Sequence, residues 1–99
     1  MNNDIKELAQ GLVNCWEEMY NIYYPEVERI ITYQIKDTNL IEHTLDHILD
    51  IYTEKGFKLY LKLVFYYSTF NIEGAYAYIN ILKEERQEEY EEYVKKLKK

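Results

Sequence analysis

Residues 57–70 read FKLYLKLVFYYSTF, and the first seven of them place an apolar side chain at every second position. An alternation of period two with many aromatic residues is typical of a β-strand. As a strand, the segment would form a hairpin with residues 75–82 by turning at residues 71–74. As a helix, it would place Lys58 and Lys62 on one face and apolar side chains elsewhere, as in the central helix of a bundle. Whether these residues form a strand or a helix therefore determines the fold class.

The segments on both sides of residues 57–70 favour the helix. Apolar side chains there recur at spacings of three and four residues, which is the period of an amphipathic helix. A two-stranded hairpin would have no sheet to join and would be only marginally stable by itself. We therefore predict a helix for residues 57–70 and an all-α fold. The first apolar stripe at helical spacing runs through Ile5, Leu8, Ala9, Leu12, Trp16, Met19, Tyr20 and Tyr23.

Capping residues predict where the helices begin and end. Asp4, followed three residues later by Glu7, has the spacing of a capping box and begins the first helix. Pro25 is expected to end or kink that helix and to serve as the first residue of a second one. Asn39 is the predicted cap of a third helix, and Gly56 is its predicted stop.

The last helix is predicted to run from about Asn71 to the C-terminus. Its apolar stripe thins after Leu82, and residues 84–99 carry six acidic and five basic side chains. We therefore expect residues 84–99 to form a charged helical extension. The complete prediction is a single helical domain, residues 1–99, built as a compact bundle of about five helices with a long C-terminal helix that projects from the body.

Several features of the sequence favour a cytoplasmic protein. Cys15 is the only cysteine, so no internal disulfide is expected, and the first residues lack the basic and apolar regions of a signal peptide. The longest apolar run, residues 59–67, is interrupted by Lys62 and is too short to span a membrane. Phe, Tyr, Met, Ile, Asn and Lys total 45 residues, against 9 for Gly, Ala, Arg and Pro. This bias is typical of an A/T-rich genome, and it suggests a phage or mobile-element product in a host cytoplasm.

The net charge of −6 is unevenly distributed along the chain. Residues 1–54 carry 11 acidic and 3 basic side chains, whereas residues 55–83 carry 4 basic and 1 acidic. Because contacts with phosphates need Lys and Arg, no direct nucleic-acid binding is expected. The acidic half leaves an alternative function open, in which its carboxylates occupy the basic groove of a nucleic-acid-binding partner. The chain would then be an acidic, DNA-mimic-like inhibitor.

The candidate metal ligands are two histidines and two aspartates of the third predicted helix. His43 and His47 lie one helical turn apart, as two imidazoles that bind one metal ion must. Asp46 and Asp50 point the same way, but all four residues also fit the solvated face of an amphipathic helix. Thr44 stands where the HExxH motif has its Glu, so the base of a metalloprotease is missing. We predict no metal or other cofactor, and a small metal-binding bundle that uses His43 and His47 remains an alternative.

The residues do not form a pattern typical of catalysis, and we predict that the chain is not an enzyme. Cys15 precedes Trp16 in the first apolar stripe, where a small apolar core residue is the expected role. A catalytic thiol would need a histidine beside it and a lowered pKa. Three glycines are too few for a phosphate-binding or dinucleotide-binding loop.

Tyrosine is the most unusual residue of the composition, with 12 copies among 99 residues. Tyrosine is enriched at protein interfaces because it buries much area at a low cost in side-chain entropy. We therefore predict a partner-binding face on the last two helices that includes Tyr66, Tyr67, Tyr76 and Tyr78. The predicted function is a non-catalytic protein-interaction module that binds a protein partner, or itself as a homodimer. A phage or mobile-element inhibitor or adaptor acting on a host protein is the concrete form.

Overall fold

The computed structural model describes the backbone of residues 2–98 and the side chains of residues 4–98. This part of the chain contains five helices and no strand, so the predicted all-α fold is confirmed, as is the helix predicted for residues 57–70. In chain order the helices are α1 (Asn2–Thr32), α2 (Thr38–Ile48), α3 (Glu54–Ser68), α4 (Ile72–Glu85) and α5 (Gln87–Leu97).

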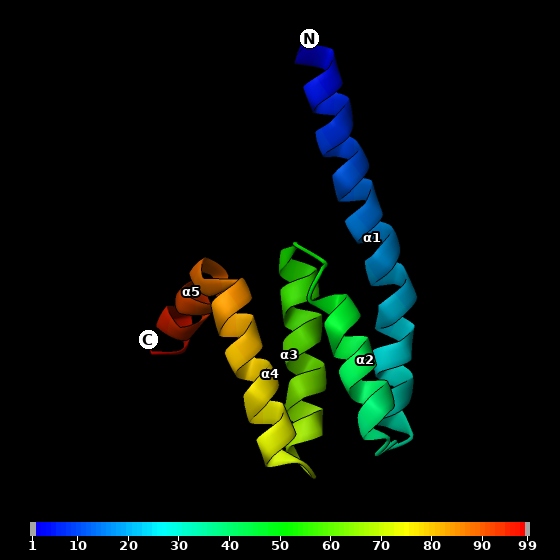
Figure 1. Ribbon diagram of the computed structural model, residues 1–99, viewed down its shortest axis with the longest axis vertical. Coiled ribbons are helices and arrows are strands. Elements are labelled where there is room, and N and C mark those ends of the chain that lie inside the picture. Colours follow the sequence, from blue (N-terminus) through cyan, green and yellow to red (C-terminus); the bar gives the residue numbers. More distant parts are fainter. Residues whose placement is uncertain (1, 99) are drawn as a thin grey trace.

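Helix α3 lies at the centre of the bundle, between α4 on one side and α1 and α2 on the other (Figure 1). Thr53 begins it, because the Thr53 hydroxyl accepts a hydrogen bond of 3.0 Å from the Gly56 N–H. Lys58 and Lys62 are exposed, whereas most of the remaining faces are covered. The period-two pattern is therefore a consequence of a helix that is buried on most sides. Its buried large side chains are Phe57, Leu59, Tyr60, Leu61, Leu63, Val64 and Tyr67.

The predicted boundary at Pro25 is wrong, because α1 continues through Pro25 to Thr32. Proline removes one backbone hydrogen bond from a helix interior. Val27 and Ile30 follow it and are fully buried, and their packing offsets that cost. The helix ends instead at Thr32, and Gln34 just beyond it has a positive φ of 52°. The Ile35 N–H then bonds back to the Ile30 carbonyl at 2.9 Å, as in a Schellman motif.

Two predicted helix boundaries around α2 are also shifted. Asp37 rather than Asn39 caps α2, because its side chain accepts a hydrogen bond of 3.2 Å from the Leu40 N–H. Gly56 does not stop a helix but lies in the first turn of α3. A Cβ atom at Gly56 would lie 2.6 Å from Cγ2 of Ile51, so the loop before α3 approaches too closely for any side chain.

The predicted long C-terminal helix is wrong in its course. Asn71 begins α4 as predicted, but the chain turns at Arg86 and forms a separate α5. The Tyr93 ring of α5 packs edge-on against Phe57 of α3, with 5.8 Å between ring centres. Figure 1 shows that the helix that projects furthest from the bundle is instead the N-terminal half of α1.

Arg86 fixes this turn, and its side chain is 1% exposed. Its guanidinium donates hydrogen bonds to the Ile51 carbonyl at 2.8 Å and to the Thr53 carbonyl at 3.0 Å, and it pairs with Glu89. The guanidinium also lies 5.5 Å from the centre of the Phe57 ring. One buried cation therefore joins the α2–α3 loop to the start of α5.

We expect Arg86→Met to lower the free energy of unfolding by about 3 kcal/mol, because two buried carbonyls and Glu89 lose their partner. Urea denaturation followed by circular dichroism measures this loss. Lys83→Met, at an exposed position of α4, is the matched control and should change stability by less than about 0.5 kcal/mol. Equal stabilities of the two variants would show that Arg86 does not anchor the turn.

Candidate interaction surface

The N-terminal part of α1 extends beyond every other helix, and we call residues 4–15 the arm (Figure 1). The arm leaves large apolar side chains in solvent: Ile5 is 69% exposed, Leu8 75% and Leu12 51%. Val13 is also exposed. Single exposed apolar residues are common on proteins, but a row of them at helical spacing indicates an uncovered face.

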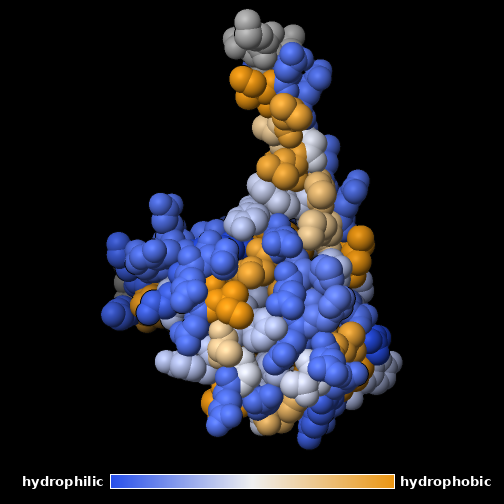
Figure 2. Space-filling view, viewed as in Figure 1, coloured by the Kyte–Doolittle hydropathy of each residue, from blue (hydrophilic) through white to orange (hydrophobic). Residues whose placement is uncertain are grey.

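The exposed row continues the face by which α1 packs on the bundle. Further along the same helix, Trp16, Met19, Tyr20 and Tyr23 pack against the hydrophobic core. These residues follow Leu12 at spacings of three and four, so they lie on the same side of the helix as Leu12. Figure 2 shows the apolar residues of the arm running down toward the body. The core-facing stripe of α1 is thus longer than the body that covers it.

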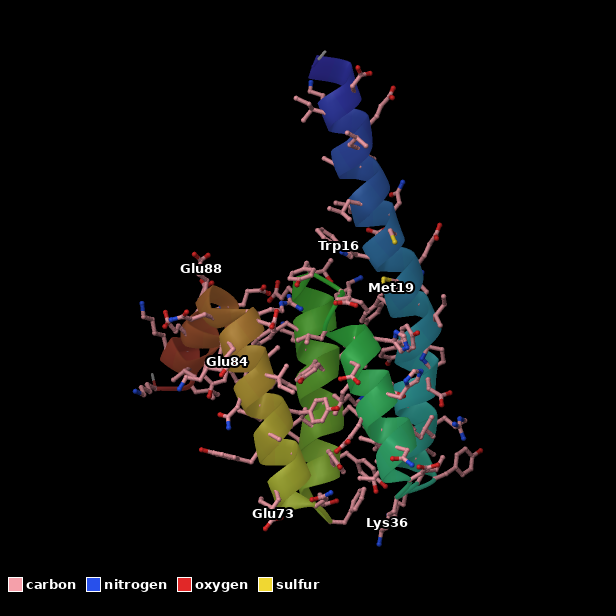
Figure 3. All side chains as sticks on the ribbon, in the orientation of Figure 1. Trp16, Met19, Lys36, Glu73, Glu84 and Glu88 are labelled. Carbon is pink, nitrogen blue, oxygen red and sulfur yellow. The ribbon has the colours of Figure 1, made fainter. Side chains whose placement is uncertain are left out.

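A hollow of about 420 Å³ lies where the arm meets the body. Trp16 and Tyr20 of α1 form one side, and Thr53 and Lys55 at the start of α3 form the other. Trp16 points from α1 toward that end of α3 (Figure 3), and its ring lies 6.0 Å from the ring of Tyr52. We call the exposed apolar row together with this hollow the arm surface.

The four tyrosines predicted to bind a partner do not form one exposed face. Tyr76 is 68% exposed, but Tyr67 is completely buried. Tyr66 and Tyr78 are partly buried, and the Tyr66 hydroxyl donates a hydrogen bond of 2.8 Å to the Ile35 carbonyl. Three of the four side chains therefore contribute to the packing of the bundle.

Tyr67 is the centre of a polar network inside the helical body. Its hydroxyl donates a hydrogen bond of 2.6 Å to Glu42 of α2 and accepts one of 2.9 Å from the Asn71 amide. The Asn71 side chain also caps α4 by accepting a hydrogen bond from the Gly74 N–H at 2.9 Å. A Cβ atom on Gly74 would lie 2.6 Å from the Tyr67 hydroxyl oxygen, so glycine is needed there. Tyr67 thus connects α2, α3 and α4.

Three of the four predicted metal ligands, His43, Asp46 and His47, lie on α2, and Asp50 lies in the turn after it. The two histidines touch. The Nε2 atoms of His43 and His47 are 3.1 Å apart, and the His47 ring stacks on Tyr23 of α1 with 5.3 Å between ring centres. Asp46 and Asp50 are exposed. Within the described part of the chain, no three His, Cys, Asp or Glu side chains converge in a way that could hold a metal ion.

Cys15, expected in the core, is exposed on the arm instead.

None of the helices in the described part of the chain combines the length and the apolar character needed to cross a membrane. No family model, curated protein or solved structure matches the chain.

We expect Tyr67→Phe to lower the free energy of unfolding by about 1–3 kcal/mol, because Glu42 and Asn71 lose a buried partner. Tyr76→Phe removes the same oxygen atom from an exposed position and should change stability by less than about 0.5 kcal/mol. Thermal unfolding of the two variants in parallel measures the difference. A destabilised Tyr76→Phe beside an unchanged Tyr67→Phe would contradict these assignments.

The buried tyrosines also predict unfolding at alkaline pH. Burial raises the pKa of Tyr78 to about 12, and it raises the pKa of Tyr60 and Tyr67 too. Unfolded tyrosines ionise near pH ~10, so above that pH the folded chain retains protons that the unfolded chain has lost. The stabilisation is complete below pH ~10 and is lost as the pH rises toward the folded-state pKa values. The part of the tyrosinate absorbance that comes from these buried tyrosines should then appear in the same cooperative step in which helical circular dichroism is lost. Complete tyrosine ionisation without loss of helix would contradict this.

Proposed function

We propose that this chain is a non-catalytic protein-interaction module that binds through the arm surface. The observation that carries the proposal is the continuity of the α1 stripe, which packs on the core from Trp16 onward and stays uncovered at Ile5, Leu8 and Leu12. Exposure of such an apolar face to water is unfavourable, and a partner that covers it lowers the free energy of the system. The proposal keeps the function class predicted from the sequence and moves the binding face from the tyrosines to the arm.

Energetic arguments support a binding role for the arm. Burying one Leu or Ile side chain completely contributes about 1.5–3 kcal/mol. A helical segment of about 12–15 residues is marginally stable by itself in water, and most helical stability in proteins comes from packing. Gly11 weakens the arm further, since nothing lies within 4 Å of the place where its Cβ would be. A partner that covers the stripe would therefore stabilise the arm as well as bind to it.

The phage or mobile-element origin, the cytoplasmic location and the action on a host protein remain parts of this proposal that rest on the sequence alone. The acidic inhibitor and the metal-binding bundle remain weaker alternatives. The contact between His43 and His47 supplies two imidazoles, which is fewer ligands than a structural metal site uses.

The arm surface is tested by a pair of double variants that add the same charge to opposite faces of α1. Leu8→Glu with Leu12→Glu places two carboxylates on the apolar row, whereas Gln10→Glu with Asn14→Glu places two on the polar face. We expect the first pair to abolish association and the second to preserve it. Sedimentation of the purified chain and affinity capture from the producing cells measure self-association and partner binding.

Neither pair should lower the free energy of unfolding by more than about 0.5 kcal/mol, because the arm side chains are exposed. This control separates lost binding from lost folding. The proposal is wrong if both double variants associate as the unmodified chain does.

A further inference from the structure

We propose that the occupant of the arm surface is a second copy of this chain, whose arm lies antiparallel against the first. The inference rests on the proposed function and names the partner for the same surface. Three features of α1 carry it: the position of the body beside the stripe, the spacing of the apolar residues and the charges along one edge of the arm.

The position of the body determines the direction in which a second arm can lie. The uncovered row faces the same side as the stripe that the body covers from Trp16 onward. In a parallel pair, the second α1 would continue past residue 16 into the space that α3 and the α2–α3 loop of the first chain already fill. In an antiparallel pair, the N-terminal end of the second arm points at the body and meets the hollow at the base of the first arm. The fold therefore admits only the antiparallel orientation for a second copy.

The spacing of the apolar residues makes the stripe complementary to itself. Two antiparallel helices bring residues into register when their numbers have a constant sum. A sum of 21 places Ile5 opposite Trp16 of the second copy and Ala9 opposite Leu12, and it brings Leu8, on one edge of the stripe, beside Cys15 on the same edge of the second copy. Ile5, Leu8 and Leu12 then each meet an apolar side chain, and Ile5 reaches the aromatic corner formed by Trp16 and Tyr52. Such an isologous match is the usual arrangement of a two-fold dimer.

The charges on one edge of the arm also fit this pairing. Lys6 and Glu17 are 11 residues apart, which is close to three complete turns, so they lie along the same edge of the stripe. In antiparallel helices this edge faces the same edge of the second copy. Lys6 of each chain therefore approaches Glu17 of the other, and the dimer gains two symmetric opposite-charge pairs.

The area available is consistent with a reversible dimer. The arm exposes four large apolar side chains, Ile5, Leu8, Leu12 and Val13, whereas a standard stable interface uses about 20–30 residues from each partner. The hollow beside Trp16 adds contact area when the tip of the second arm enters it. An interface smaller than the standard size is typical of weak, reversible complexes, and we expect the midpoint of dimerisation in the micromolar range.

Disulfide mapping tests the orientation, because Cys15 is the only native thiol. Leu8 and Cys15 lie seven residues apart on one edge of the arm, and antiparallel pairing brings residue 8 of one chain beside Cys15 of the other. We expect the L8C chain to form a covalent dimer under mild oxidation, whereas the L8C/C15S chain and the native chain do not. E7C, on the polar face of the arm, is the matched control and should not cross-link.

The outcomes separate this inference from the proposed function. A covalent L8C dimer that persists in L8C/C15S would mean parallel pairing and would overturn the inference. A chain that stays monomeric at concentrations tenfold above the expected midpoint would also overturn it. In that case the proposed function would still stand if the two Glu substitutions at Leu8 and Leu12 abolished capture of a different protein. If those substitutions changed neither self-association nor capture, the proposed function would fail as well.

Discussion

The burial of α3 is the constraint on which the rest of the structure depends. Because α3 is apolar on most of its faces, it must be covered by α1, α2 and α4 together. A helix of 15 residues is about 22 Å long, whereas the 31 residues of α1 span about 46 Å. The body built around α3 can therefore cover only about half of α1. The arm is the half that remains, and its apolar face follows from this difference in length.

Polar contacts fix the helices around α3 in one arrangement. Tyr67 bonds to α2 through Glu42 and to the cap of α4 through Asn71. Arg86 joins the loop before α3 to the start of α5. Within the described residues, each buried side-chain nitrogen or oxygen has a hydrogen-bond partner. The polar groups buried in the body are thus paired, whereas the arm leaves the apolar side chains of Ile5, Leu8 and Leu12 exposed to water.

Residue patterns predicted the type of each secondary-structure element well and the boundaries of the helices less well. The stripe of residues 5–23 was recognisable as helical, and the start of a helix at about Asn71 was placed correctly. Local patterns could not reveal that burial of Val27 and Ile30 would carry α1 through Pro25, or that Arg86 would find carbonyl partners more than 30 residues away. The same limit applies to the candidate site. Periodicity identified an apolar face on residues 5–23, but only the length of α3 shows which part of it stays uncovered.

Small-angle X-ray scattering of the associated chain tests the central claim most directly. A single chain is 51 Å long, and its arm lies along the long axis (Figure 1). In the proposed register residue 2 of each chain lies beside residue 19 of the other, so the two helices overlap over about 17 residues. The overlap removes about 26 Å from twice the length of one chain, and the dimer would extend to about 76 Å. The account predicts this maximum dimension together with the mass of two chains. A dimer of about 50–60 Å, with the two bodies side by side, would contradict it, as would a mass that stays that of one chain.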